Sequence, residues 1–158
     1  MEGLTIRLGT AEDADVLARH RCQMFSEMGV LSAKGYPDLE AASIQYFRES
    51  LPDGAYLAWL VCDDDEVVAG GGMQVNTIPP RPGPDGNLLG SGPQGLIVNM
   101  YVEKPWRRKG VASWLLREMI DFARQTGIPS LTLHASNEGR PLYERHGFTP
   151  TSEMRLYI

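Results

Sequence analysis

A basic turn near residue 110 has the residue types that bind phosphate. Arg107, Arg108 and Lys109 are followed by Gly110 and by a small residue, Ala112. Positive side chains pair with phosphate oxygens, and the small residues leave no bulky side chain between the backbone and a ligand. If a helix begins here, its first backbone N–H groups and its dipole also favour an anion. The turn therefore predicts a phosphate site, with solvated surface charges as the alternative.

The segments on either side of this turn are expected to be a strand and a helix. Residues 96–102 are apolar and β-branched, and the run is too short for an ordinary helix, so it indicates a buried strand that ends before Pro105. After the turn, apolar residues recur at helical spacing as far as Ala123. Gly127 is placed to close that helix in a left-handed conformation.

In this context Arg107-x-x-Gly110-x-Ala112 resembles the Q/R-x-x-G-x-G/A signature of the GNAT acyltransferases. In that family the signature follows the fourth strand, and its backbone amides hold the pyrophosphate of acetyl-CoA. Residues 133–148 resemble the family's next signature, a strand, an asparagine and a helix ending in L-Y-x-x-x-G-F. The matching residues are Asn137, Leu142, Tyr143, Gly147 and Phe148. Two ordered signatures at the correct separation are far more specific than either alone.

The resemblance implies a mixed α/β (α+β) fold. Its central sheet would be twisted and mostly antiparallel, with about six to seven strands, about four flanking helices and a splay between strands four and five. Hydrophobic periodicity and turn residues by themselves give the order β-α-α-β-β-β-α-β-α-β, which indicates a mixed sheet. The expected strands are residues 5–8, 56–62, 66–76, 96–102, 130–135 and a pair within 148–158, and the expected helices are 11–27, 39–50, one from 110 and 137–146.

Three local features sharpen this expectation. Thr10 followed by Asp13 is close to a capping box for the first helix. Gly35 and Pro37 are expected to break the chain, so that residues 30–39 form a loop. Three consecutive glycines at 70–72 weaken a strand, which suggests a bulge or the close approach of another backbone or a ligand.

Residues 77–94 have the least regular pattern. Their sequence, TIPPRPGPDGNLLGSGPQ, is rich in proline and glycine, which predicts neither helix nor regular sheet. One interpretation is a disordered surface loop. The other is a mobile loop over a substrate site, because long loops in compact domains are often functional.

The resemblance also assigns roles within the site. Tyr143 would be the general acid that protonates the leaving thiolate, since a phenol with a pKa of about 10 keeps its proton at neutral pH; a packed core tyrosine is the alternative. Backbone N–H groups near residues 100–102 would stabilise the oxyanion. Asn137 would hold pantetheine or instead cap a helix. The implied cofactor-binding residues are Met100, Tyr101, Val102, Arg107, Arg108, Lys109, Gly110, Val111, Ala112, Asn137 and Tyr143.

No general base follows from the resemblance. Some relatives carry a glutamate at the start of the fourth strand, where this chain has Leu96. Glu27, at the end of the first helix, and His134, on the fifth strand, are the candidates. Each has a structural or solvated role as its alternative, and water or bulk deprotonation is the default.

Length and composition set outer limits. The chain has 158 residues and 42% hydrophobic content, which suggests one domain spanning 1–158 with a substantial core. A net charge of −5 argues against a general nucleic-acid binder and is compatible with a cationic amine substrate. Two cysteines do not make a disulfide framework, and neither a signal peptide nor a membrane-spanning run is evident. A cytoplasmic protein with no membrane partner is expected.

The leading hypothesis is an acetyl-CoA-dependent N-acetyltransferase. A primary amine of a small molecule or a protein would attack the thioester directly, with acetyl-CoA as cosubstrate and no metal. The alternative is a GNAT-like module that binds CoA in a regulatory role without turnover. A nucleic-acid module built on the basic turn is a further rival, which the acidic total disfavours. Similar proteins often dimerise, so a homodimer is left open.

Overall fold

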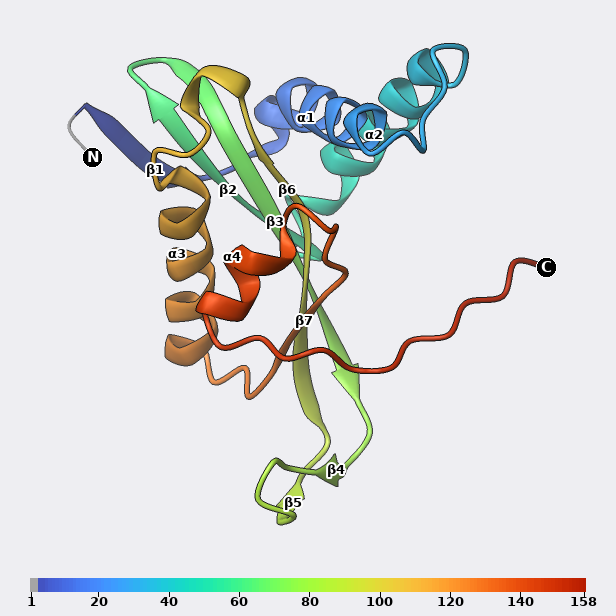
Figure 1. The fold of residues 1–158 in the computed structure, drawn as a ribbon, viewed down its shortest axis with the longest axis vertical. Coiled ribbons are helices and arrows are strands. Elements are labelled where there is room, and N and C mark those ends of the chain that lie inside the picture. Colours follow the sequence, from blue (N-terminus) through green and yellow to red (C-terminus); the bar gives the residue numbers. More distant parts are fainter. Residues whose placement is uncertain (1–2) are drawn as a thin grey trace.

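The computed structural model describes residues 3–158, and its main element is a five-stranded sheet with the order β1-β2-β3-β6-β7 (Figure 1). The first four strands pair antiparallel, whereas β6 and β7 pair parallel. The strands are β1 (Leu4–Leu8), β2 (Tyr56–Asp63), β3 (Glu66–Ile78), β6 (Gly92–Val102) and β7 (Leu131–Leu133). The expected mixed, mostly antiparallel sheet is confirmed.

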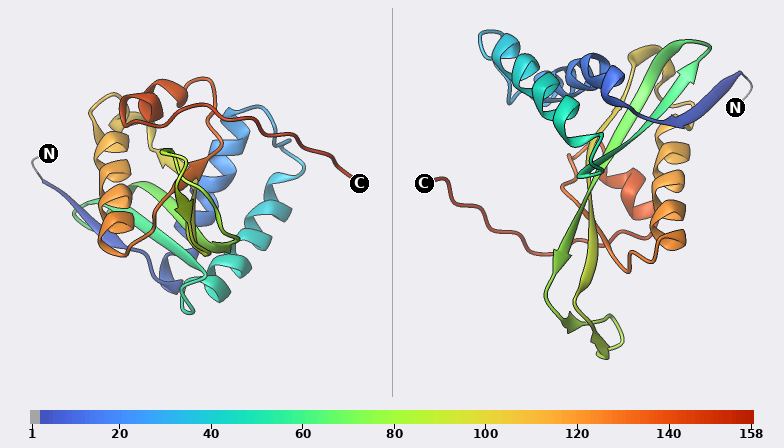
Figure 2. Two further views of the ribbon diagram at one scale, coloured as in Figure 1. Left: turned by 90° about the horizontal axis from the view of Figure 1, so that it is seen from below. Right: turned by 180° about the vertical axis from the view of Figure 1, so that it is seen from behind.

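Two pairs of helices cover opposite sides of this sheet (Figure 2). The helices are α1 (Ala14–Glu27) and α2 (Tyr36–Ser50) on one side, and α3 (Val111–Gln125) and α4 (Arg140–Arg145) on the other. None of the helices within residues 3–158 is long and apolar enough to cross a membrane.

Alternate residues of β2 build the two cores, because neighbouring side chains in a strand point to opposite faces. Trp59 and Val61 pack in the cluster that includes the buried face of α3. Tyr56, Ala58 and Leu60 pack in the cluster formed with α1 and α2. The sheet therefore separates two hydrophobic layers, and a side chain's position along a strand decides which layer it enters.

The start of α1 follows the expected capping pattern. Asp13 accepts a hydrogen bond from the backbone N–H of Thr10 at 2.8 Å, as in a capping box. Arg7 of β1 adds a bidentate pair to the same carboxylate, at 2.7 and 2.8 Å. That guanidinium is the main reason why the pKa of Asp13 is lowered. Residues 11–13 form a short 3₁₀ turn, η1 (Ala11–Asp13), before the α-helix begins.

The second helix begins earlier than the sequence predicted. It starts at Tyr36 instead of 39, and Pro37 lies in its first turn. Proline is tolerated there because the first N–H groups of a helix have no partner within the helix. The interpretation of Pro37 as a breaker was therefore wrong.

Residues 77–94 form an ordered β arm, which corrects the prediction of an irregular loop. β3 continues to Ile78 and β6 begins at Gly92, so the two strands remain paired well beyond the body of the sheet. At their end β4 (Arg81–Pro82) and β5 (Leu88–Leu89) form a two-stranded hairpin. The arm protrudes from the rest of the molecule (Figures 1 and 2).

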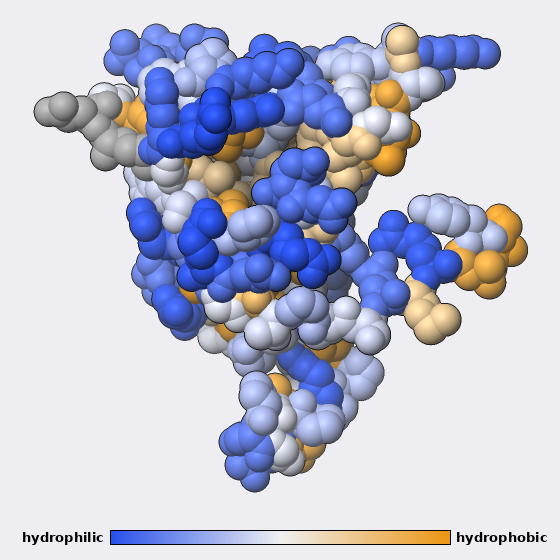
Figure 3. All heavy atoms as spheres, viewed as in Figure 1, coloured by the Kyte–Doolittle hydropathy of each residue, from blue (hydrophilic) through white to orange (hydrophobic). Residues whose placement is uncertain are grey.

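The predicted pair of terminal strands is absent. After α4 the chain is extended, and residues 149–158 have no strand partner. A strand needs a neighbour for its backbone groups, and this segment leads away from the sheet (Figure 1). Its apolar end is open to solvent (Figure 3), with Leu156 82% exposed. The predicted fifth strand is also shorter, since β7 covers only three residues.

Candidate active site

The site is built around the point where β6 and β7 separate. The two strands pair in parallel at only three positions, ending at Ile97 and Leu133. Beyond Ile97, β6 continues to Val102, and no described strand pairs with it on that side. Met100, Tyr101 and Val102 therefore lie on a free strand edge. Such an edge offers backbone N–H and C=O groups to an extended ligand.

A β-bulge lies in the same part of β6. Gly70 pairs with Tyr101 and Gly72 with Val98, so β6 contains one more residue than β3 over this interval. Asn99 adopts a left-handed conformation there, with φ of 57°. The bulge places the Asn99 side chain on the α1 side, where it bonds Arg21 and Tyr56. The expected irregularity at the glycine run is thus confirmed as a change of register.

The glycine run also permits a close approach. A Cβ atom on Gly72 would lie 1.8 Å from the Tyr56 hydroxyl oxygen, and one on Gly71 would lie 2.4 Å from the Met100 sulfur. Only glycine allows these side chains to lie directly on β3. The approaching groups belong to this chain: Tyr56 lies on the side of α1 and α2, and Met100 packs on the side of α3.

The basic turn lies between β6 and α3 and opens to solvent. After η2 (Lys104–Trp106), Arg108 and Gly110 have φ of 60° and 84°. A Cβ atom on Gly110 would meet nothing within 4 Å. The following residues, Val111 and Ala112, form the first turn of α3, whose N–H groups have no partner within the helix. This is the strand–turn–helix unit that the sequence predicted.

The three basic side chains of this turn have different surroundings. Arg107 donates from Nε to the Val102 carbonyl at 2.7 Å and pairs with Glu27 at 2.8 Å. Lys109 lies with its ammonium 5.0 Å from the centre of the Trp106 ring. Arg108 is exposed. Arg107 therefore fastens the turn to α1, and Arg108 and Lys109 remain at the surface.

The two base candidates have separate charged partners. Glu27 accepts from the Tyr101 hydroxyl at 3.1 Å and pairs with Arg107, at the edge of a second pocket of about 460 Å³. His134 is 55% exposed and pairs with Glu153 of the C-terminal segment. The structure joins Glu27 to the basic turn and His134 to the terminal segment.

Tyr143 lies on α4, the helix that follows β7. Its ring packs against the core and is T-shaped to Phe148, with 6.0 Å between ring centroids. Burial raises the pKa of Tyr143, so the phenol stays protonated at neutral pH. Among residues 3–158 its hydroxyl has no hydrogen-bond partner. The phenol therefore has an available proton.

Asn137 lies in the loop before α4 and is exposed. It does not cap the helix, so the alternative role considered for it was wrong. The turn is closed by Ser136, whose hydroxyl accepts the Gly139 N–H at 3.1 Å. The helix itself begins only at Arg140, and Pro141 falls in its first turn as the sequence requires.

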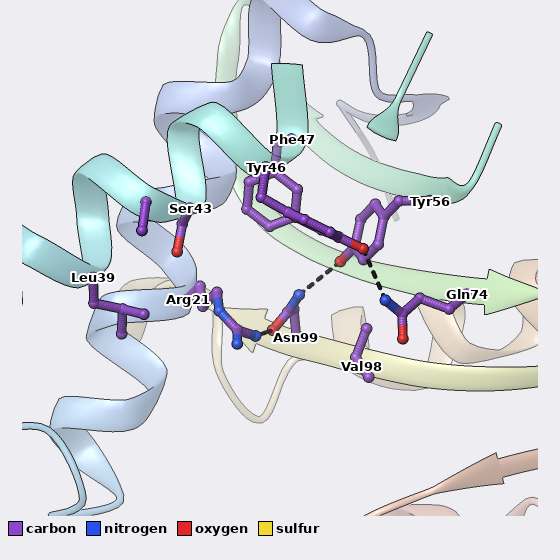
Figure 4. A pocket seen from close by; sticks show the side chains of 10 residues that line it. Arg21, Leu39, Ser43, Tyr46, Phe47, Tyr56, Gln74, Val98 and Asn99 are labelled. Carbon is purple, nitrogen blue, oxygen red and sulfur yellow. Dashed lines mark hydrogen bonds between the residues drawn. The ribbon is translucent and has the colours of Figure 1, made fainter. Parts of the chain in front are cut away.

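A pocket of about 360 Å³ lies between α1, α2 and the bulged part of the sheet (Figure 4). Its polar lining residues are Arg21, Ser43, Tyr46, Tyr56, Gln74 and Asn99. No Asp, Glu or His is among the described residues that line it. The sequence did not single out Arg21, Tyr56 or Asn99. An asparagine inside the apolar run 96–102 was the one available signal, because a polar residue there needs a partner.

Within the described part of the chain, no group of three His, Cys, Asp or Glu residues could hold a metal ion. His20 is the most buried imidazole, at 2% exposure, and its Nε2 lies 3.2 Å from Glu103. Burial lowers the pKa of His20 to about 4. This ring is therefore neutral at pH 7 and packs between α1 and the sheet, with 5.0 Å between its centroid and that of the Tyr101 ring.

Comparison with known proteins identifies this arrangement. A sequence model described as the acetyltransferase (GNAT) family matches residues 20–148. The structure of a GCN5-related N-acetyltransferase from Ralstonia eutropha JMP134 has a TM-score of 0.85 at 31% identity, covering 99% of each chain. A "predicted acetyltransferase with acetyl-CoA" from Clostridium acetobutylicum has a TM-score of 0.83 at 24% identity, covering 98% of this chain and 96% of that one. At 24% identity, the similarity to the Clostridium acetobutylicum structure concerns the fold alone.

A shorter match concerns a curated bacterial protein. Over 54 residues the chain is 39% identical to "Putative phosphinothricin acetyltransferase YwnH" of Bacillus subtilis (strain 168). That match spans 32% of this chain and 33% of the relative, so it covers about a third of either protein. Together, the family match and the full-length structural likeness confirm the resemblance seen in the two sequence signatures.

Proposed function

The chain belongs to the GNAT acetyltransferase family, and from that premise we propose that it transfers the acetyl group of acetyl-CoA to a primary amine. The acceptor would be a small molecule or a protein. One observation carries the proposal: the free edge of β6 is followed, after the turn of residues 103–110, by the open N-terminus of α3. An extended thiol arm and a diphosphate can therefore be held by one continuous stretch of backbone.

The residues present fit such a cosubstrate. Met100, Tyr101 and Val102 offer the backbone groups that pair with the amides of pantetheine. The N–H groups of the α3 first turn, with the open space above Gly110, suit the pyrophosphate. Arg108 and Lys109 add positive charge at that end, while Arg107 holds the loop in position. Asn137, exposed before α4, would hold the thiol arm from the side of β7.

Acetyl-CoA would supply the activated acyl group as a thioester, and each further requirement is assigned to this chain. Backbone N–H groups at the β6 bulge, near Met100, would stabilise the developing oxyanion. Tyr143 would give its proton to the leaving sulfur, a role that its raised pKa and unpaired hydroxyl support. The amine, with an ordinary pKa of about 10.4, must first lose a proton. Glu27 and His134 remain candidates for that step, with water as the default because each side chain already contacts a charged partner, Arg107 or Glu153.

The acceptor would enter from the pocket between α1 and α2. Val98 and Asn99 line this pocket and also belong to the free part of β6. An amine in the pocket is therefore beside the strand that would hold the thioester. Among the described lining residues, none has an acidic or imidazole side chain that could act as the general base. This observation favours the alternative, a CoA-binding module without turnover.

Calorimetry with CoA and acetyl-CoA, combined with thiol release over a panel of amines, tests the proposal. Binding and release support an acetyltransferase, whereas binding without any release supports the regulatory alternative. The absence of heat with either ligand would reject both.

A substitution then tests the acid. Tyr143→Phe should lower turnover by about 10²–10⁴-fold, the usual contribution of a general acid, with cofactor affinity little changed. Tyr157→Phe is the matched control, because Tyr157 lies in the exposed C-terminal segment. Unchanged turnover in Tyr143→Phe would remove this residue from the mechanism.

A further inference from the structure

The pocket between α1 and α2 contains one unneutralised charge. Arg21 is the only charged residue among the lining residues that the structure describes. Its guanidinium lies 4.7 Å from the centre of the Phe25 ring and donates to the Asn99 side-chain oxygen (Figure 4). Within residues 3–158 it pairs with no carboxylate. By contrast, Arg19 on the same helix pairs with Glu103.

The hydroxyl groups of the pocket also have protons to donate. The Tyr56 hydroxyl accepts from the Asn99 amide, and the Tyr46 hydroxyl accepts from the Gln74 amide, both at 2.8 Å (Figure 4). Each hydroxyl therefore keeps its own O–H proton for another acceptor. Burial raises the pKa of Tyr56, so that proton is retained at neutral pH. The lining thus combines one cation with hydrogen-bond donors and offers no carboxylate.

Such a lining is suited to an anion. A guanidinium held by an amide and an aromatic ring is oriented in advance, and it binds a carboxylate or a phosphorus oxyanion through charge-assisted hydrogen bonds. The cavity volume of about 360 Å³ is near the lower end of the range for small-molecule sites, roughly 300–1,000 Å³. An occupant of amino-acid size fits this volume.

We propose that the acceptor is a small primary amine that carries an anionic group, which Arg21 binds. The inference rests on the proposed acetyl transfer and specifies its substrate class. Arg21 and Asn99 are in contact, and Asn99 lies in the bulge of the free part of β6. The anionic end of the acceptor is therefore fixed at Arg21 while its amine faces the strand edge. Arg21 is in this role a specificity-determining residue.

Matched pairs of acceptors test this assignment. Each amino acid or aminophosphonic acid is compared with its neutral amide or ester in the thiol-release assay with acetyl-CoA. The anionic member should have a kcat/KM about 10–100-fold higher, the effect of a hydrogen bond to a charged group. Comparing the amino acids with the aminophosphonic acids shows whether a carboxylate or a phosphonate is preferred. A preference for either anion supports the proposal.

Substitutions locate the effect. Arg21→Gln should remove that preference by raising KM for the anionic acceptors, and Arg21→Lys should keep part of it. Arg48→Gln is the control, because Arg48 lies on α2 outside the lining and pairs with Asp15. Calorimetric affinity for acetyl-CoA should stay the same in all three variants, which also shows that they are folded.

Two results would overturn the inference without affecting the proposed acetyl transfer. One is equal use of the anionic and neutral members by the parent protein. The other is an equal loss for both members in Arg21→Gln. Heat with acetyl-CoA but no thiol release with any anionic amine would also reject it. If acetyl-CoA gave no heat, the proposed function would fail first.

Discussion

Replacing Gly72 by alanine should distort the pocket between α1 and α2 through Tyr56. The added Cβ would lie 1.8 Å from the Tyr56 hydroxyl oxygen and 2.0 Å from Cζ, whereas real Cβ contacts are essentially never below 3.0 Å. The ring cannot rotate into solvent, because Tyr56 is 1% exposed and packs against Phe47 with 5.1 Å between ring centroids. Overpacking of this kind costs about 1–3 kcal/mol, and the lost hydrogen bond to Asn99 adds about 1 kcal/mol. We expect the free energy of unfolding to fall by about 2–4 kcal/mol.

Urea denaturation with a constant m-value measures this change. Gly92→Ala is the matched control, since Gly92 also lies in a strand and its added Cβ would meet nothing within 4 Å; its stability should stay within about 0.5 kcal/mol of the parent. In a Tyr56→Leu background, Gly72→Ala should cost much less, giving a coupling energy above about 1 kcal/mol. A stability of Gly72→Ala equal to that of the parent would refute the packing argument.

Two further predictions concern the basic turn and the buried imidazole. Gly110→Glu places bulk and negative charge beside the first turn of α3, so calorimetric binding of CoA should be lost; intact binding in a folded variant would contradict the phosphate assignment. Because the pKa of His20 is lowered from 6.5 to about 4, the unfolded chain binds the proton more readily. Stability should therefore fall as the pH drops from 6.5 toward 4, by up to roughly 3 kcal/mol. His20→Gln should flatten this dependence in urea titrations.

The elements that sequence predicted well are those specified by neighbouring residues. The apolar stripe of α3 is buried at Val111, Leu115 and Met119, and Gly127 has the left-handed φ of 72° expected after the helix. The signal for the turn before α3 was equally local, because Gly110 itself indicates the turn. Periodicity and a terminal glycine carry this information without any contact from elsewhere in the chain.

The elements that sequence missed depend on distant pairing. The arm 77–94 contains proline and glycine, yet Asn76 pairs with Gln94 and Ile78 with Gly92, so each strand is held by the other. No local pattern shows that pairing. At residues 149–158 the error was the opposite one. The sequence predicted strands there, but within the described chain no neighbouring strand pairs with this segment. At both places, a segment forms a strand only where another strand is available to pair with it.

The pocket between α1 and α2 was missed for the same reason, although Asn99, a polar residue within an apolar run, was one clue in the sequence. Gly72 lets the Tyr56 ring lie on β3, the Tyr56 hydroxyl accepts from Asn99, and Asn99 in turn accepts from Arg21. These residues come from β3, β2, β6 and α1, so only the packed fold brings them together. Gly72 is therefore explained by the pocket wall that it admits, whereas Gly71 makes room for the Met100 sulfur on the side of α3. Arg21 is the cation at the end of these contacts. The proposed preference for anionic acceptors is therefore the measurement that tests whether this network serves binding.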